Sequence, residues 1–132
     1  SVRMFREAGY SSWAAELNLA TMELYEGHFE RGRWMVRETV KRHGDLDHVD
    51  LAIHTIELGC AAGLGQLQAV GEHLAWLEQV WEQTGHAEPD CADLLADAAN
   101  ELRGVREVRL ADRVEALARN HRERLERKTP DR

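Results

Sequence analysis

Apolar side chains recur at intervals of three and four residues along most of the chain, which is the spacing of one face of an α-helix. The clearest stripe is formed by Leu67, Val70, Leu74, Leu77 and Trp81. An earlier stripe is formed by Trp13, Leu17, Ala20 and Leu24. The sequence has no alternating β-branched runs and no Asn-Gly or Asp-Gly hairpin turns. The pattern therefore predicts an all-α fold.

Glycines divide the predicted helices into pairs. Gly27, Gly65 and Gly104 each separate two amphipathic segments, and they lie 38 and 39 residues apart. A short glycine-centred break between helices is typical of a helical hairpin. We predict one helical-repeat domain over residues 1–128, with hairpins at about 12–43, 47–84 and 89–127 and a disordered tail at 129–132. Residues 1–8 are expected to be the second helix of a preceding unit, which would make the chain a fragment.

The first hairpin resembles the tetratricopeptide repeat. Asn18-Leu19-Ala20 lies on its first helix, and Gly27-His28-Phe29 with Gly32 is similar to the turn of that family. The segment Arg6–Gly9 is similar to repeat junctions of bacterial regulators. The resemblance implies antiparallel hairpins stacked as a right-handed superhelix, in a larger bacterial protein. The second and third hairpins share little more than the glycine with the first, and a compact helical bundle is the alternative fold.

Acidic side chains are concentrated in the middle of the chain. The formal net charge is −7, and residues 43–102 contain twelve Asp or Glu side chains but no Lys or Arg. Such a segment would repel nucleic acid and anionic lipid and would favour a basic protein or peptide as partner, although a solvated acidic face is the simpler interpretation. No apolar run is long enough to span a membrane, and no secretory signal is recognisable. The spacing of Cys60 and Cys91 favours buried, reduced thiols and a cytoplasmic location.

Sequence motifs of catalysis and nucleotide binding are not found. The sequence contains no Gly-x-Ser-x-Gly, no phosphate loop and no His-Glu-x-x-His. We therefore predict a non-enzymatic protein without a cofactor. Asp50, His54 and Glu57 share one helical face, which would hold a divalent metal if another helix added ligands. Their His-x-x-Glu order is reversed from that of di-iron bundles, so surface hydrogen bonding is the preferred interpretation.

The resemblance to tetratricopeptide repeats implies a scaffold or regulatory module that binds a peptide or a partner helix. In such arrays the first helices of the hairpins form a concave binding surface. The residues predicted to contact the partner are polar positions of the first helices and one tryptophan of a second helix: Asn18, Glu23, Trp34, His54, Glu57 and Asp97. Two other functions stay open. One is a small-molecule or metal-sensing domain with a pocket among Trp34, His54 and Trp76, and the other is a bundle that forms a homodimer.

Overall fold

The computed structural model describes residues 12–44, 46 and 49–128, and within them it contains six α-helices and no strand. The helices are α2 (Ser12–Tyr25), α3 (Phe29–His43), α4 (Asp50–Gly63), α5 (Leu67–Thr84), α6 (Pro89–Gly104) and α7 (Val108–Lys128). The all-α prediction is confirmed. The helix predicted at residues 1–8 and the tail predicted at 129–132 lie outside the described residues.

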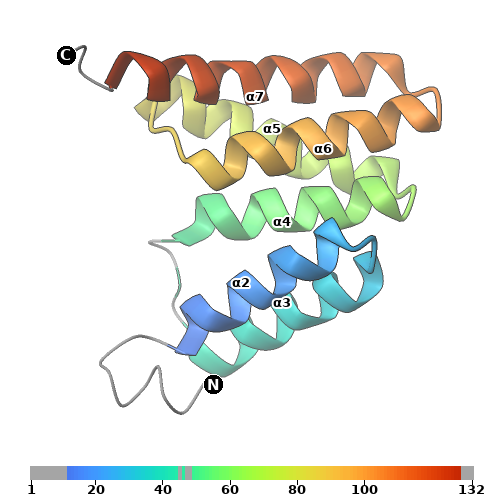
Figure 1. The fold of residues 1–132 in the computed structure, drawn as a ribbon, viewed down its shortest axis with the longest axis vertical. Coiled ribbons are helices and arrows are strands. Elements are labelled where there is room, and N and C mark those ends of the chain that lie inside the picture. Colours follow the sequence, from blue (N-terminus) through green and yellow to red (C-terminus); the bar gives the residue numbers. More distant parts are fainter. Residues whose placement is uncertain (1–11, 45, 47–48, 129–132) are drawn as a thin grey trace.

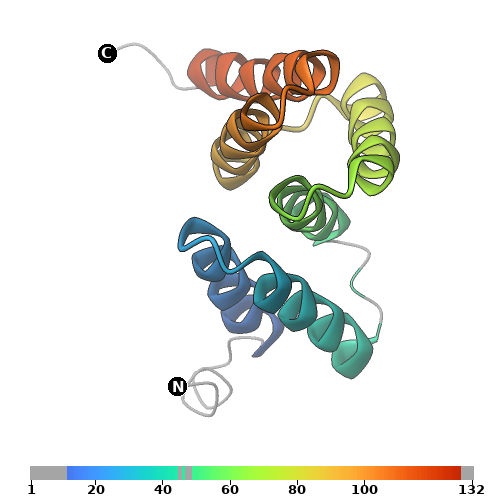
Figure 2. The same cartoon turned by 90° about the vertical axis from the view of Figure 1, so that its right-hand side faces the viewer.

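The helices form three hairpins, α2–α3, α4–α5 and α6–α7, which stack along the long axis of the molecule (Figure 1). The first helices of the hairpins are neighbours, because α4 contacts both α2 and α6. Figure 2 shows α2 and α6 on the same side of α4. The stacking is not fully regular. Helix α3 contacts α4 between the first two hairpins, whereas α5 contacts α7 between the last two.

Two groups of buried apolar side chains join the hairpins. The larger group joins α4, α5, α6 and α7 and includes Leu58, Leu74, Leu95 and Val114, which are completely buried. The smaller group joins α2, α3, α4 and α6, and its members are Leu17, Ala20, Leu24, Val36, Ile56, Cys60 and Leu94. Because α4 and α6 contribute to both groups, burial of apolar surface connects each hairpin to its neighbour.

The two cysteines belong to this buried interior. Both are free thiols, as predicted. Burial raises the pKa of Cys60 to about 12 and that of Cys91 to about 11. Since the thiolate is the reactive form, both side chains act as apolar packing rather than as nucleophiles.

The same backbone turn closes all three hairpins. Two residues after each first helix comes a residue with positive φ, which is Gly27, Gly65 or Arg106. In the first hairpin the N–H of Gly27 donates to the Leu24 carbonyl at 2.9 Å, and the next N–H donates to the Glu23 carbonyl at 2.8 Å. Equivalent bond pairs recur at residues 65–66 and 106–107. This arrangement is the Schellman C-cap, which satisfies carbonyl groups at a helix end.

The third hinge was predicted at Gly104, and that position is wrong. Gly104 is the last residue of α6, and Arg106 adopts the left-handed backbone with φ of 65°. The hinges are therefore 38 and 41 residues apart, and α7 begins only at Val108. The repeat is regular in its turn geometry but not in its glycines.

Replacing Arg106 by glycine is expected to stabilise the fold by roughly 0.5–1 kcal/mol. A side chain in left-handed backbone costs about 1–2 kcal/mol, and the greater freedom of glycine in the unfolded chain cancels part of that gain. Urea unfolding measures the change. Gly65→Ala is the matched control, because a Cβ there meets nothing within 4 Å and tests the backbone alone. Gly65→Ala should destabilise the fold. If Arg106→Gly leaves the free energy of unfolding unchanged, the backbone at Arg106 is not strained.

Candidate functional site

The three first helices enclose a groove, which we call the first-helix groove. Residues of α2, α4 and α6 line it, with α4 as the floor between the other two helices (Figure 2). The groove contains two pockets of about 330 Å³ and 160 Å³ that share Leu94. The larger pocket lies at the α2–α3 turn, beside Tyr25 and Gly59, and the smaller one lies beside Trp13 and Ala52.

The floor of the groove is apolar because of what α4 presents there. Val49, Ala52 and Ile56 recur at intervals of three and four residues and line the smaller pocket. In the larger pocket α4 presents Gly59, where an added Cβ would come within 2.7 Å of Leu24 Cδ2. The missing side chain at Gly59 thus lets α2 approach α4 at this end of the groove.

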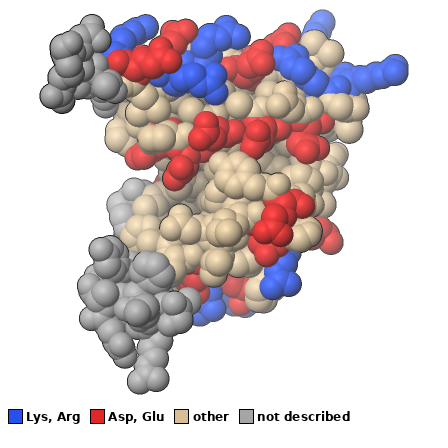
Figure 3. Space-filling view, in the orientation of Figure 1, with Lys and Arg blue, Asp and Glu red and all other residues tan. Residues whose placement is uncertain are grey.

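One wall of the groove is strongly acidic. Helix α6 carries four exposed carboxylates, which we call the acidic row: Asp90, Asp93, Asp97 and Glu101. Their spacing of three, four and four residues places them on one face of the helix. Figure 3 shows acidic side chains following α6 above a largely uncharged surface. Asp90, Asp97 and Glu101 line the two pockets.

The four carboxylates of the acidic row have no cationic partner in the described helices, whereas several other carboxylates of the molecule are paired. Glu16 pairs with Arg42, and Glu78 pairs with Arg113 at 2.6 Å. In the part of the chain that the structure describes, no Lys, Arg or His forms an ion pair with any member of the acidic row. The charge on this wall is therefore uncompensated within the described residues.

The carboxylates of the acidic row act electrostatically across the groove. Burial raises the pKa of Tyr25 on α2, and the charges of Asp93, Asp97 and Asp90 raise it further. Burial also raises the pKa of Asp97, with the neighbouring Asp93 adding to the effect. Both shifts indicate a site where negative charge is partly withdrawn from water and would be relieved by a cation.

Two of the six residues predicted to bind a partner line this groove. Asn18 lies in the smaller pocket and Asp97 in the larger one. Glu23 does not line either pocket. Its carboxylate is 2.8 Å from His28 Nδ1 and 3.4 Å from Arg31 Nε, so it stabilises the α2–α3 turn. Glu23 therefore lies outside the first-helix groove, and its contact with a partner stays a prediction.

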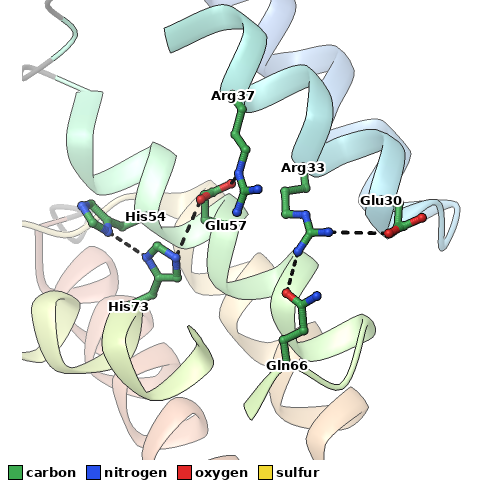
Figure 4. A network of polar contacts seen from close by, with 7 residues as sticks. All are labelled: Glu30, Arg33, Arg37, His54, Glu57, Gln66 and His73. Carbon is green, nitrogen blue, oxygen red and sulfur yellow. Dashed lines mark hydrogen bonds and ion pairs between the residues drawn. The ribbon is translucent and has the colours of Figure 1, made fainter. Parts of the chain in front are cut away.

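His54 and Glu57 also lie outside the linings of both pockets, and their side chains contact residues of α3 and α5 (Figure 4). His54 Nδ1 is 3.0 Å from His73 Nδ1, and the His54 ring stacks on Trp76 with centroids 3.9 Å apart. Glu57 lies 3.4 Å from Arg37 Nε and 3.8 Å from His73 Nε2. Burial lowers the pKa of His54, and the adjacent His73 lowers it further. These contacts connect α4 to both α3 and α5. The side chains of His54 and Glu57 therefore help to pack the three helices together.

Trp34 lines neither pocket of the first-helix groove. Its side chain is 63% exposed on α3, in a shallow depression beside Arg33 and Arg37. His54 and Trp76 are instead stacked between α4 and α5, so the structure does not bring the three residues of the predicted sensor pocket together. Among the described residues there is also no group of three or more His, Cys, Asp or Glu side chains that could hold a metal ion.

Comparisons with known proteins add no family to this description. No family model matches the chain, and no curated protein and no solved structure matches it significantly. Among the described helices, none combines the length and the apolar character that a membrane crossing requires. The geometry of the first-helix groove is therefore the basis for a functional proposal.

Sequence reasoning found only part of this groove. It singled out Asp97 but not Asp90, Asp93 or Glu101, although their helical spacing was visible in the sequence. It also missed Tyr25 and Leu94, which reach the groove because α2 and α6 both pack against α4. No local pattern distinguishes these two residues from ordinary core or surface positions.

Proposed function

We propose that this chain is a non-enzymatic interaction module of tetratricopeptide-like type, which binds a segment of a partner protein in the first-helix groove. One observation carries the proposal: the groove combines an apolar floor with a wall of uncompensated carboxylates. Apolar pockets with a few charged groups on one side are typical of protein and peptide recognition.

The hairpin architecture supports the tetratricopeptide-like assignment. Three hairpins carry the same C-cap turn, and their first helices are neighbours. Gly32, part of the motif that resembles the family, is buried, and an added Cβ would come within 2.6 Å of Leu24 Cδ1. A small residue is thus needed where the two helices of the first hairpin pack closely.

Filling the groove is expected to weaken peptide binding by at least tenfold without unfolding the protein. Asn18→Trp adds an indole at an exposed position of the smaller pocket. Peptides would be selected from a display library of random 16-residue sequences against the wild-type protein, and their affinities would then be measured on the variant. We expect a loss of at least tenfold, because the indole occupies the volume that a peptide side chain would enter.

Gln79→Trp is the matched control, because it adds the same indole at an exposed position of α5. It should leave the affinities unchanged, and the thermal midpoints of both variants should stay near that of the wild type. Selected peptides that bind Asn18→Trp as tightly as the wild type would overturn the proposed function.

A further inference from the structure

We infer that the occupant of the first-helix groove is a basic amphipathic α-helix that lies along the acidic row of α6. This inference rests on the proposed function and specifies the chemistry of the partner. Three features support it. The apolar floor lacks hydrogen-bonding groups for the backbone of an extended peptide, α6 carries a row of negative charges, and the two pockets lie at a suitable separation.

The apolar floor favours a helix over an extended segment. The lining residues of the floor and of the α2 wall are mostly apolar, and all of the α2, α4 and α6 backbone there is helical. Side-chain amides occur in the pockets only at Asn18 and Asn100. An extended peptide would therefore press unpaired N–H and C=O groups against apolar side chains, which is costly. A helix satisfies these groups internally.

The acidic row favours a cationic occupant. From Asp90 to Glu101 the row extends for about 16 Å along α6, at a rise of 1.5 Å per residue. A second helix beside α6 would present Lys or Arg to it at every third or fourth position. Helices α2 and α4 contain no Lys or Arg, so nothing on the opposite wall or the floor repels these cations.

The basic residue of α6 does not interfere with such an occupant. Arg103 Nη1 is 3.1 Å from Asp112, and Nη2 is 2.8 Å from Glu115, so its guanidinium is directed to α7. The charges that face the groove from α6 are thus the carboxylates of the acidic row. A cationic helix meets attraction along this wall, which also increases its association rate.

The two pockets place the apolar anchors of the occupant. On α6 the smaller pocket is bounded by Asp90, Cys91 and Leu94, and the larger by Leu94, Asp97, Ala98, Asn100 and Glu101. Their centres are therefore about two helical turns apart, or roughly 10 Å. Apolar side chains at positions i and i+7 of the occupant match this separation, and the pocket of about 330 Å³ admits the bulkier one.

Three designed 18-residue peptides test the inference by fluorescence anisotropy. The first carries Leu and Phe at i and i+7 with Lys at flanking positions three or four residues apart. The second has the same composition in a scrambled order that removes the amphipathic face, and the third replaces each Lys by Glu. We expect the first to bind at least tenfold more tightly than the other two, with an affinity that falls as salt is raised.

A protein variant tests the role of the acidic row. Asp93→Asn combined with Asp97→Asn and Glu101→Gln removes three charges while preserving shape, and it should weaken the first peptide by about tenfold and reduce the salt dependence. The control combines Glu72→Gln, Glu82→Gln and Glu126→Gln, which neutralise exposed carboxylates on α5 and α7. This control should bind the first peptide within about twofold of the wild type.

The results of these experiments separate the proposed function from the identity of the occupant. Equal binding of the scrambled or the Glu peptide, or full affinity in the neutralised α6 variant, would overturn the basic helix as occupant. If library-selected peptides of other character still depend on Asn18, the proposed function holds and only the identity of the occupant is wrong. If neither the designed nor the selected peptides depend on the groove, both proposals are overturned.

Discussion

Lowering the pH from 8 to 5 is expected to destabilise the fold by about 2 kcal/mol through His121 alone. The side chain of His121 is 1% exposed, and its Nδ1 accepts a hydrogen bond from the Glu88 N–H at 3.1 Å. The ring lies against Trp81, with centroids 4.8 Å apart. Burial lowers the pKa of His121 to about 4, and the charge of Glu88 offsets this only in part. Protonation of Nδ1 would also remove the hydrogen bond.

The direction of this pH effect follows from proton binding in the two states. In the unfolded chain the pKa of a histidine is near 6.5, so between pH 6.5 and 4 the unfolded state binds more protons than the folded state. The free energy of unfolding therefore falls as the pH drops through 6.5. At pH 4 the loss of unfolding free energy through His121 reaches about 3 kcal/mol, and it changes little below that pH.

Urea unfolding at pH 8 and pH 5 of the wild type and of His121→Leu measures this contribution. At pH 8 the variant should be less stable by about 1–3 kcal/mol, because the Glu88 N–H loses its acceptor. Between the two pH values, however, it should lose about 2 kcal/mol less than the wild type. His86→Gln, at an exposed position on the same connection, is the control. It should lose nearly as much stability as the wild type, because burial is the main cause of the lowered pKa of His121 and the charge of His86 only adds to it. Parallel pH profiles for wild type and His121→Leu would show that His121 is not the titrating group.

The positions of the helices could be predicted because apolar periodicity is a local property. The stripe from Leu67 to Trp81 became α5, with Val70, Leu74 and Leu77 buried as the spacing indicated. The third hinge could not be found in the same way. Leu102 is fully buried, and its packing keeps the last turn of α6 helical as far as Gly104. The left-handed residue then falls on Arg106, where the sequence carries no glycine.

A residue of the candidate site could be predicted only where its own helix determines that its side chain is exposed. Asn18 and Asp97 lie on faces of α2 and α6 that no other described helix covers, and they line the groove. Helix α4 is different, because α2, α3, α5 and α6 all contact it. Its polar side chains therefore meet neighbouring helices, as Glu57 meets Arg37 and His73. Which helices surround α4 is a tertiary property that periodicity alone does not contain.

Two adjacent leucines of α6 are expected to stabilise different parts of the molecule. Leu95 is completely buried in the group that joins α4 to α7, and Leu95→Ala should cost about 3–4 kcal/mol. Leu94 is 4% exposed, belongs to the group that joins α2 and α3 to α4 and α6, and lines both pockets of the groove. Leu94→Ala should cost about 2–3 kcal/mol, because it is the less deeply buried of the two.

Hydrogen exchange of the native protein shows where each loss of stability occurs, and each variant is the control for the other. Leu94→Ala should lower amide protection mainly in α2 and α3, while Leu95→Ala should lower it in α5, α6 and α7. This division follows from nearest-neighbour coupling, in which each hairpin is stabilised by the hairpin stacked beside it. A uniform loss of protection in both variants would instead indicate one cooperative core. The α2 wall of the groove would then be as stable as its α6 wall.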